Sequence, residues 1–199
     1  SEFQERILAF YRHHGRDLPW RRTTDPYAIL VSEIMLQQTQ VPRVEQKYPG
    51  FLETFPDFSA LAAASLPDLL TAWQGMGYNR RALALQKTAR IVVDEYDGEV
   101  PDDPEILESF PGIGRATARS ICAFAFNMPT VFIETNIRRV FIHCFFPRQE
   151  SVPDAGILPL VERTLYVNDP RTWYNALMDL GTRLRDEGID PNRRSRHYV

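Results

Sequence analysis

The sequence predicts an all-α protein with short loops, and three observations support this prediction. Apolar residues recur at helical spacing along most of the 199 residues. Helix-start signals, such as the pairs Asp25-Pro26 and Asp169-Pro170, stand directly before these runs. The one strand-like run, Val131-Phe132-Ile133, is too short to pair convincingly.

The first half of the chain carries three predicted helices. Asp25-Pro26 supplies an N-cap and a first-turn proline, and the apolar residues that follow recur at helical spacing as far as Val41. A serine and a proline open a short helix over 65–73. Alanines and leucines at helical period predict a helix over 80–96, which stops before a glycine.

The second half of the chain carries four predicted helices. Pro104 begins the first helix of a hairpin, whose second helix spans 115–126. A further helix is predicted from about 136 to 145. The last follows Asp169-Pro170 and has a tryptophan and three leucines as its apolar stripe.

The composition is that of a soluble globular protein. Hydrophobic residues make up 44% and charged residues 25% of a chain long enough for one domain or two small lobes. No apolar run is long enough to span a bilayer, and we expect no secretory signal. Cys122 and Cys144 stand in apolar surroundings, so we expect buried free thiols in a reducing cytoplasm. Two cysteines cannot supply a four-cysteine zinc or iron–sulfur site.

The charge balance leaves two interpretations open. The net charge of −3 is not typical of nucleic-acid binders, because neutralisation of phosphates drives their affinity. The positive charge, however, is nearly all arginine and includes four arginine pairs, several of them beside turns or helix starts. These pairs form a basic stripe on one face, or they belong to an ordinary surface of mixed charge. The pairs are Arg21-Arg22, Arg80-Arg81, Arg138-Arg139 and Arg193-Arg194.

The run Pro111-Gly112-Ile113-Gly114 is the most informative stretch of the chain. It predicts a tight turn between two helices, in which Gly112 and Gly114 can take positive φ and let the backbone approach another molecule. The second helix starts directly after the turn, so its unpaired N–H groups and positive dipole end point at whatever lies there. A DNA phosphate suits such a place. The alternative is an ordinary helical hairpin whose glycines serve packing.

Two glutamates stand out against this helical background. Glu33 lies among the apolar residues of 31–41, where burial would raise its pKa and make it a general acid near neutral pH. Glu134 stands at a helix start, where the dipole favours the ionised carboxylate. One protonated and one charged carboxyl form the pair that cleaves glycosidic bonds. The alternatives are a surface residue of an amphipathic helix and an ordinary helix-start acid.

Seven motifs are spaced along nearly the whole chain: 18–21 (LPWR), 25–27 (DPY), 32–41 (SEIMLQQTQV), 73–78 (WQGMGY), 111–115 (PGIGR), 136–140 (NIRRV) and 176–181 (ALMDLG). In this order they resemble adenine DNA glycosylases of the MutY type, which belong to the helix-hairpin-helix (HhH-GPD) superfamily. SEIMLQQTQV is highly specific, whereas DNA-binding proteins that are not enzymes also use the hairpin. The resemblance implies a two-lobed helical fold, in which 1–24 and 130–199 form one lobe and 25–129 form the other, with the hairpin at 104–126.

The resemblance also implies an enzyme that bends double-stranded DNA and flips a mispaired or damaged nucleotide into a cleft. Glu33 matches the glutamate that protonates the departing base and helps activate water. Gln37 and Gln38 match the segment that fills the gap in the duplex, and Tyr78 matches a tyrosine that wedges beside the orphan base. The other implied DNA contacts are Thr39, Arg80, Gly112, Gly114, Arg115, Thr117 and Arg138, and the implied base pocket holds Trp20, Arg22 and Asn175.

Three positions depart from the family pattern near the chemistry. Glu134 occupies the place of the catalytic aspartate, and because glutamate caps helices poorly, Thr135 or Asn136 is expected to cap instead. Ala116 stands where bifunctional relatives carry a Schiff-base lysine and MutY-type enzymes usually a tyrosine, so we expect no lysine-mediated strand cleavage. Asn175 aligns with a longer Gln or Glu that contacts adenine, which leaves the preferred base open.

The C-terminal end departs most from the family. After residues 180–181 the family usually places four cysteines that hold an iron–sulfur cluster, but Arg185 falls at the first of these positions and the tail over 190–198 is basic. This resembles a clusterless branch, in which the tail takes over packing or DNA contact. We therefore expect no metal and no cofactor. Separately, we expect no Nudix-like domain. A monovalent ion in the hairpin turn, as in some relatives, stays open.

The sequence thus predicts a monofunctional DNA glycosylase of base excision repair, acting as a monomer on double-stranded DNA with a mismatch or lesion, adenine favoured. Glu33 is the expected acid and Glu134 the stabilising carboxylate. One alternative is a catalytically weak or silent DNA-binding relative, which Ala116 and Glu134 favour. The other is a glycosylase for uracil, thymine or a deaminated purine. All of these fit a cytoplasmic, nucleoid-associated protein without a membrane partner.

Overall fold

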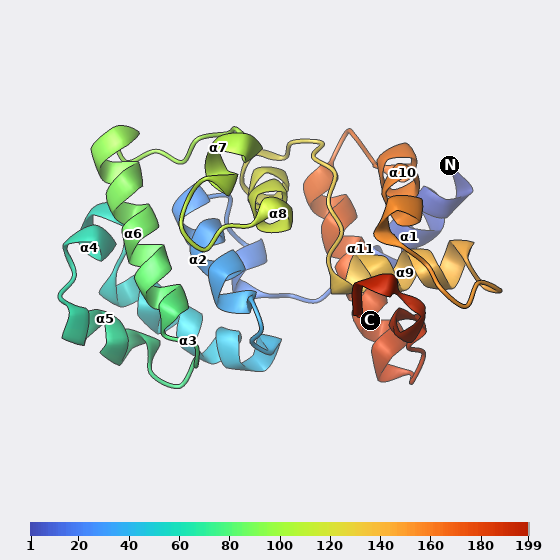
Figure 1. The fold of residues 1–199 in the computed structure, drawn as a ribbon, viewed down its shortest axis with the longest axis horizontal. Coiled ribbons are helices and arrows are strands. Elements are labelled where there is room, and N and C mark those ends of the chain that lie inside the picture. Colours follow the sequence, from blue (N-terminus) through green and yellow to red (C-terminus); the bar gives the residue numbers. More distant parts are fainter. Residues whose placement is uncertain (199) are drawn as a thin grey trace. The chain divides into compact units, whose positions relative to one another are not determined.

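The computed structural model describes residues 1–198 (Figure 1). Within this range the regular structure consists of helices, apart from one isolated β-bridge between Val152 and Ser195. This arrangement confirms the predicted all-α class. The chain forms two compact units: unit 1 contains Ser1–Arg16 and the chain from Asn127 onward, and unit 2 contains Asp17–Phe126.

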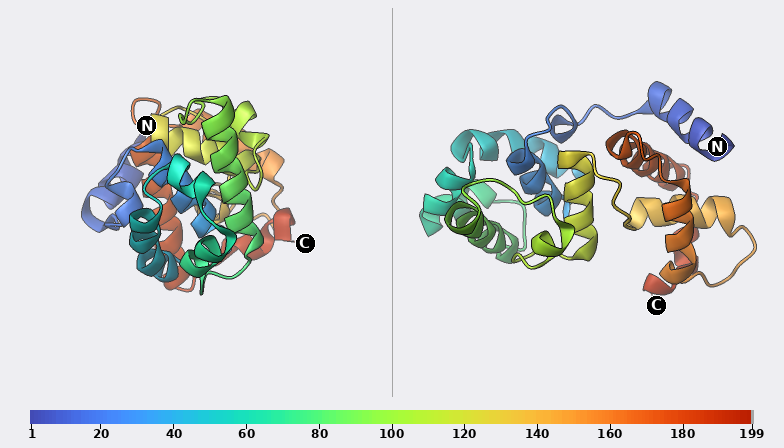
Figure 2. Two further views of the ribbon diagram at one scale, coloured as in Figure 1. Left: turned by 90° about the vertical axis from the view of Figure 1, so that its left-hand side faces the viewer. Right: turned by 90° about the horizontal axis from the view of Figure 1, so that it is seen from above.

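Unit 2 is built around the helix α2. Its helices are η1 (Pro19–Arg21), α2 (Pro26–Leu36), α3 (Val41–Thr54), α4 (Phe58–Ala63), α5 (Leu66–Trp73), α6 (Arg80–Glu95), α7 (Pro104–Glu108) and α8 (Arg115–Phe126). The helix α2 is apolar nearly all round, and such a helix is stable only when neighbours cover it on every side. The elements η1, α3, α6 and α8 all pack against it, which places α2 in the middle of the unit (Figures 1 and 2).

Unit 1 is built around the helix α11. Its helices are α1 (Glu2–His14), α9 (Thr135–Phe145), α10 (Asp154–Thr164), α11 (Pro170–Asp186), η2 (Pro191–Arg194) and η3 (Arg196–Tyr198). The helices α1 and α9 pack against α11, and the buried Trp173 and Phe141 fill the space among them. Gly181 lets the start of α9 come very close, because a Cβ at this position would lie 2.5 Å from the Cβ of Asn136.

The helix predicted from Asp25-Pro26 is shorter than its apolar stripe. It ends at Leu36, because Gln37 takes an extended conformation and Gln38 a left-handed one with φ 55°. The apolar Val41 therefore begins the next helix instead of completing α2. The other predicted helices are present with ends within one or two residues, except that the hairpin helix from residue 104 is a short one. The helices α1, α3, α4 and α10 were not predicted.

The run 131–133 forms no strand in the described chain, as expected from its short length. One smaller expectation is wrong. Cys122 is buried as expected, but Cys144 is exposed. The whole last turn of α9, residues 143–145, is exposed, so its apolar sequence neighbours do not bury the thiol. Among the described residues no helix is long and apolar enough to cross a membrane.

Candidate functional site

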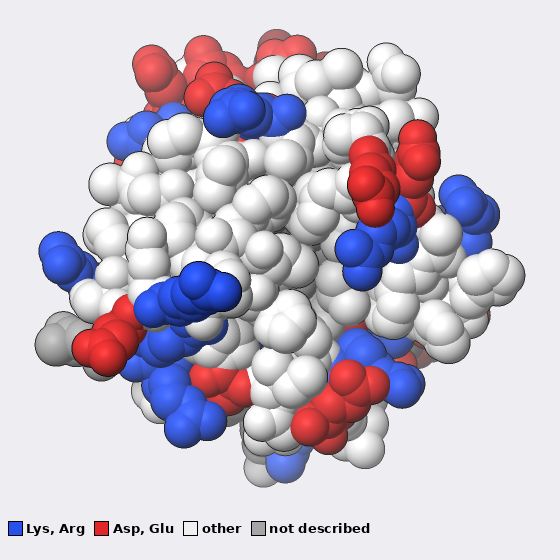
Figure 3. Space-filling view, turned by 90° about the vertical axis from the view of Figure 1, so that its right-hand side faces the viewer, with Lys and Arg blue, Asp and Glu red and all other residues white. Residues whose placement is uncertain are grey.

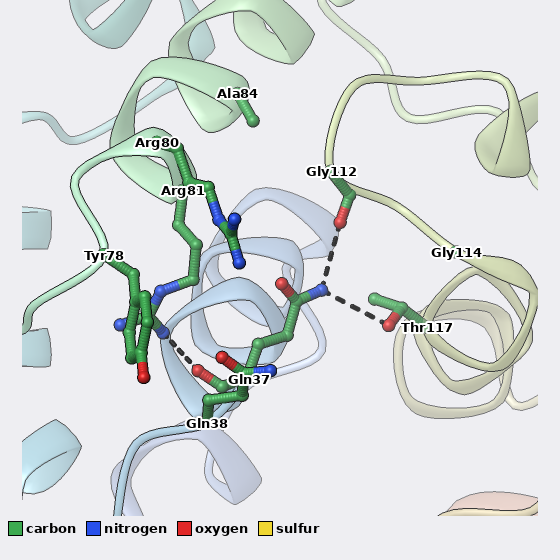
Figure 4. Close-up of a pocket in the computed structure, with 9 residues that line it drawn as sticks. All are labelled: Gln37, Gln38, Tyr78, Arg80, Arg81, Ala84, Gly112, Gly114 and Thr117. Atoms are coloured by element: carbon green, nitrogen blue, oxygen red, sulfur yellow. Dashed lines mark hydrogen bonds between the residues drawn. The ribbon is translucent and has the colours of Figure 1, made fainter.

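A pocket of about 650 Å³ opens on unit 2 (Figure 4). Three segments that are distant in sequence meet around it: the turn after α2, the start of α6 with the turn before it, and the hairpin turn between α7 and α8. The lining residues are Gln37, Gln38, Tyr78, Arg80, Arg81, Ala84, Gly112, Gly114 and Thr117. All of these residues except Arg81 and Ala84 were predicted to contact DNA.

Tyr78 is presented to solvent by a turn with an unusual backbone. Its φ of 47° is left-handed, and Gly75 and Gly77 beside it have φ values of 86° and 72°. Bulky residues rarely adopt such a conformation, which persists only where the surroundings hold it. The Tyr78 side chain is 57% exposed, a large value for an aromatic residue. The guanidinium carbon of the exposed Arg80 lies 5.7 Å from the centre of this ring.

Arg81 joins the two turns that line the pocket. Its buried guanidinium donates to the carbonyls of Met35 (2.9 Å), Ile34 (3.2 Å) and Gln37 at the end of α2, and to the hydroxyl of Thr39 (2.9 Å). It also donates to the carbonyls of Met76 (3.0 Å) and Gly77 (3.2 Å). Burial lowers the pKa of this guanidinium. One side chain therefore fixes the turn after α2 and the turn that carries Tyr78.

The burial of Arg81 could have been predicted from the sequence. In the predicted helix over 80–96, Arg81 stands four residues before Leu85 and eight before Ala89, so it belongs to the apolar stripe. A cation on a buried stripe is rare unless its hydrogen bonds are satisfied inside the protein. Both interpretations of the Arg80-Arg81 pair placed Arg81 on the surface, whereas it is buried.

The hairpin turn meets α6 at Gly112. This residue has φ 76°, and a Cβ on it would lie 2.9 Å from the Cβ of Ala84. Its carbonyl accepts a hydrogen bond from Nε2 of Gln37 (3.1 Å), which also lies 3.4 Å from Oγ1 of Thr117. Gly114 was expected to be able to take a positive φ like Gly112, but its φ is not left-handed. A Cβ on Gly114 would meet no atom within 4 Å. Its exposed backbone lies directly before the first turn of α8, whose N–H groups favour an anion.

The two hairpin glycines are therefore expected to respond differently to alanine. Gly112→Ala adds a Cβ against Ala84 at a left-handed residue, so we expect a loss of about 2 kcal/mol in unfolding free energy. Gly114→Ala meets open space and should change stability by less than about 0.5 kcal/mol. It should still weaken duplex binding, because the new methyl group keeps a phosphate away from the backbone. Chemical denaturation and fluorescence anisotropy with a labelled duplex test both expectations, and equal stability losses would contradict them.

Glu33 lies on α2 one helical turn before Gln37 and faces α8. The hydroxyl of Ser120 on α8 lies 2.5 Å from Oε2 of Glu33. The residues around Glu33 in α2 are buried, whereas Glu33 itself is partly exposed. A carboxyl in such a place is held by its neighbours and still accessible, as a general acid must be.

Glu134 caps α9 itself, contrary to the expectation that Thr135 or Asn136 would do so. Its carboxylate accepts from the backbone N–H of Ile137 (2.7 Å) and lies 3.4 Å from Nδ2 of Asn136. Burial raises the pKa of Glu134, although the N–H groups of Ile137 and Asn136 and the charges of the two following arginines act in the opposite direction. The N–H groups at the start of α9 favour the ionised carboxylate, as expected, but desolvation outweighs them, so the net shift of the Glu134 pKa is upward.

This raised pKa predicts a pH-dependent effect of Glu134→Gln on stability. The folded-state pKa lies above 4.5, so ionising Glu134 costs stability that is absent below pH 4.5. This loss of stability grows as the pH rises from 4.5 to the folded-state pKa of Glu134, and it stays constant at higher pH. Glutamine keeps an acceptor for the N–H of Ile137 but cannot ionise. We therefore expect the difference in Tm, Glu134→Gln minus wild type, to increase as the pH rises through this range. Thermal unfolding from pH 4 to 8 measures it. A difference that falls with pH would contradict the sign.

Arg138 is not available for the DNA contact that was predicted. Its side chain is buried, and its guanidinium donates to both carboxylate oxygens of Asp154 at 2.8 and 2.7 Å. The charge of Arg138 lowers the pKa of Asp154. The neighbouring Arg139 donates to Oδ1 of Asn136 (2.6 Å) and to the carbonyl of Gly181 (3.1 Å). This arginine pair therefore holds unit 1 together, because a buried cation must have its partners inside the protein.

The basic tail packs on unit 1. Nδ2 of Asn192 donates to the carbonyl of Thr135 (2.9 Å), directly beside Glu134, and Arg194 donates to the carbonyls of Phe146 (2.5 Å) and Gln149 (2.9 Å). These contacts are those of a segment that packs on the protein. The face of the molecule in Figure 3 carries basic and acidic side chains interspersed, which favours a surface of mixed charge there.

The described residues do not fit an iron–sulfur cluster. Such a cluster takes four thiolates, whereas Cys122 lies on α8 of unit 2 and Cys144 on α9 of unit 1. Within residues 1–198 no three His, Cys, Asp or Glu side chains gather in a way that could hold a metal ion.

The remaining predicted residues do not line the pocket. Trp20 is buried and packs edge-to-face on Tyr48, with ring centres 5.7 Å apart. Arg22 is exposed and forms a two-pronged ion pair with Asp17 at 2.7 Å. Asn175 is buried in α11 of unit 1. Arg115 is exposed at the start of α8.

The chain resembles known repair proteins in sequence and structure. Residues 31–155 match the sequence model of the HhH-GPD superfamily base excision DNA repair proteins. The adenine DNA glycosylase of Mycolicibacterium smegmatis is 40% identical over 177 residues, which cover 88% of this chain and 60% of that protein. That of Mycobacterium tuberculosis is 42% identical over 182 residues, with 88% and 59% covered. A solved thermostable thymine-DNA glycosylase superposes with a TM-score of 0.83 at 29% identity, covering 90% of this chain and 84% of that one. The chain spans about 60% of the length of the two adenine DNA glycosylases.

Proposed function

The chain belongs to the HhH-GPD superfamily of base excision DNA repair proteins, and from this membership we propose that it is a DNA glycosylase that hydrolyses the N-glycosidic bond of a mispaired adenine. The pocket of unit 2 carries the proposal, because it gathers a glutamine turn, an exposed tyrosine and a glycine hairpin around one opening. The choice of adenine is supported by the two relatives that are adenine DNA glycosylases.

The pocket suits double-stranded DNA with a disturbed base pair. The exposed ring of Tyr78 offers a stacking surface for a base that has lost its partner. The amides of Gln37 and Gln38 can donate and accept hydrogen bonds where a flipped base leaves a gap. Arg80 and the first turn of α8 after Gly114 supply positive charge for the backbone. We propose that the protein acts on DNA in this way as a monomer, without a metal or a cluster.

The proposed reaction uses the two glutamates in different roles. Glu33 transfers a proton to the departing base, so that the base leaves as a neutral molecule and the bond electrons go with it. The sugar becomes an oxocarbenium ion, which the carboxylate of Glu134 stabilises by its negative charge. Water then adds to C1′ of the sugar, and Glu33, now a carboxylate, accepts the proton that the water loses. The products are the free base and an abasic site, and Glu33 is protonated again.

We expect the protein to leave the DNA strand intact after base release. Strand cleavage by a lyase requires an amine that forms an imine with the sugar. Ala116 is exposed at the start of α8 and has no amine, and neither Lys47 nor Lys87 lines the pocket. Labelled duplexes should therefore break only after alkali, and borohydride should trap no covalent adduct. Breakage without alkali, or a trapped adduct, would contradict the monofunctional assignment.

A panel of labelled duplexes tests the proposed function itself. The duplexes carry adenine opposite guanine, 8-oxoguanine or cytosine, and also thymine, uracil or hypoxanthine in mispairs. We expect alkali-labile sites first of all where adenine is mispaired. The thymine mispair belongs in the panel because the thymine-DNA glycosylase has the same fold. Binding to a mismatch without any base release would show a silent DNA-binding relative instead.

A further inference from the structure

The hydroxyl of Ser120 stands between two oxygen atoms. Ser120 lies on α8 with 3% of its surface exposed. Its Oγ is 2.5 Å from Oε2 of Glu33 on α2 and 2.9 Å from the carbonyl oxygen of Thr117, one turn earlier on α8. The three residues belong to unit 2, and α2 packs directly against α8.

The protons of the Ser120 hydroxyl and the Glu33 carboxyl can be placed in two ways at this site. A serine hydroxyl has one proton to donate, and a carbonyl can only accept. In the first arrangement Ser120 donates to Oε2 of Glu33, so the proton of a neutral Glu33 sits on the other carboxyl oxygen. In the second arrangement Ser120 donates to Thr117, and Oε2 of a protonated Glu33 donates to Ser120. The first arrangement favours ionised Glu33, and the second favours the protonated acid.

We propose that Ser120 is a positioning residue that donates to Oε2 of Glu33, which leaves the transferable proton of the acid on the other oxygen. When that proton moves to the departing base, the hydrogen bond from Ser120 becomes charge-assisted and stronger. The proton of Ser120 itself stays on Oγ throughout. The carbonyl of Thr117 keeps its place in the backbone ladder of α8, so it does not need this hydroxyl. This role rests on the proposed function, in which Glu33 is the acid.

The other charged and hydrogen-bonding groups on the elements around α2 are present in every Ser120 variant. Arg81 on α6 binds the carbonyls directly after Glu33, and Tyr48 on α3 donates to a carbonyl one turn and a half before it. Arg21 belongs to η1, and Arg119 on α8 lies near the carbonyl of residue 115. Because these groups are present in every variant, a difference between variants reports the Ser120 hydroxyl.

The direct test is a titration of the Glu33 carboxyl in the intact protein. Carbon-13 NMR of carboxyl-labelled glutamate follows the signal that disappears in Glu33→Gln. We expect the titration midpoint to rise by about one pH unit in Ser120→Ala, because a donor to the charged form is lost. Ser120→Thr keeps the hydroxyl and should keep the midpoint. An unchanged or lowered midpoint in Ser120→Ala would overturn the proposal.

Ser32→Ala is a matched control for the loss of a buried hydroxyl. Ser32 neighbours Glu33 in sequence, is 1% exposed, and donates to the carbonyl three residues earlier, as a serine in a helix often does. The control should leave the Glu33 midpoint unchanged. A shift as large as that of Ser120→Ala would show that packing, and not the hydroxyl of Ser120, sets the titration.

Kinetics separate this proposal from the proposed function. If the protein releases a base, single-turnover rates of Ser120→Ala should fall about tenfold, and the alkaline limb of the pH profile should move upward with the NMR midpoint. Duplex affinity should stay the same. If no duplex loses a base, the proposed function fails, while the NMR titration still decides whether Ser120 donates to Glu33. A lowered rate with an unmoved limb and midpoint would make Ser120 merely structural.

Discussion

Replacing Glu33 by glutamine is expected to lower the single-turnover rate of base release by a factor of about 1,000 or more. Glutamine has nearly the same size and can keep a hydrogen bond to Ser120, but it cannot transfer a proton to the departing base. Loss of a general acid typically costs 10² to 10⁴ in rate, and Glu33 in the proposed reaction also accepts the proton of the attacking water. The affinity for a mismatched duplex and the Tm should remain close to those of the wild type.

The matched control for this substitution is Glu53→Gln. Glu53 is an exposed glutamate of α3 in the same unit, so the variant removes one negative charge without touching the pocket. Its rate of base release should equal that of the wild type. If Glu33→Gln retained most of the activity, the proton would have to come from another group, and Glu33 would lose its assigned role.

The substitution Arg81→Met is expected to lower the free energy of unfolding by about 3 kcal/mol or more. Methionine fills much of the space but donates nothing, so buried carbonyls at the end of α2 and in the 76–77 turn lose a donor. Each buried polar group left unsatisfied costs about 1–3 kcal/mol. Duplex binding should weaken as well, because the turns that carry Gln37 and Tyr78 are no longer fixed to each other.

The neighbouring residue provides the control, since Arg80→Met removes the same charge from an exposed side chain. We expect its stability to change by less than about 0.5 kcal/mol. Its duplex affinity should fall, and the slope of log affinity against log salt concentration should decrease by about one, as for a lost phosphate contact. Urea denaturation and anisotropy titrations at several salt concentrations measure both variants. Equal stability losses in the two variants would contradict the role given to Arg81.

Much of the fold could be predicted because its signals are local. Aspartate or serine caps, first-turn prolines and apolar stripes mark α5, α6, α8, α9 and α11 in the sequence itself. The end of α2 could not be predicted in this way. The apolar spacing continues to Val41, and only the hydrogen bonds from Arg81, which is distant in sequence, show why the chain turns at Gln37.

The candidate site could be predicted in part for the same reason. The residues around the pocket carry family motifs, so Gln37, Tyr78 and Gly112 were recognised from their order along the chain. Ser120 lies outside every such motif, and its contact with Glu33 depends on how α8 packs against α2. The pKa of Glu134 depends on burial, which a helix-start position does not reveal. Contacts between helices and the desolvation of a carboxyl arise only in the folded chain, so local sequence patterns do not reveal them.

The most direct measurement is the identification of the released base and of the oxygen added to the sugar. Purified protein is incubated in ¹⁸O-labelled water with a duplex that carries adenine opposite guanine or 8-oxoguanine, and the products are analysed by mass spectrometry. We expect free adenine in equal amount to abasic sites, with one ¹⁸O atom at the sugar, and far less of both products in the same time with Glu33→Gln. The absence of free base from every mispaired duplex, or equal release by Glu33→Gln, would contradict the proposal that this chain is a glycosylase using Glu33 as its acid.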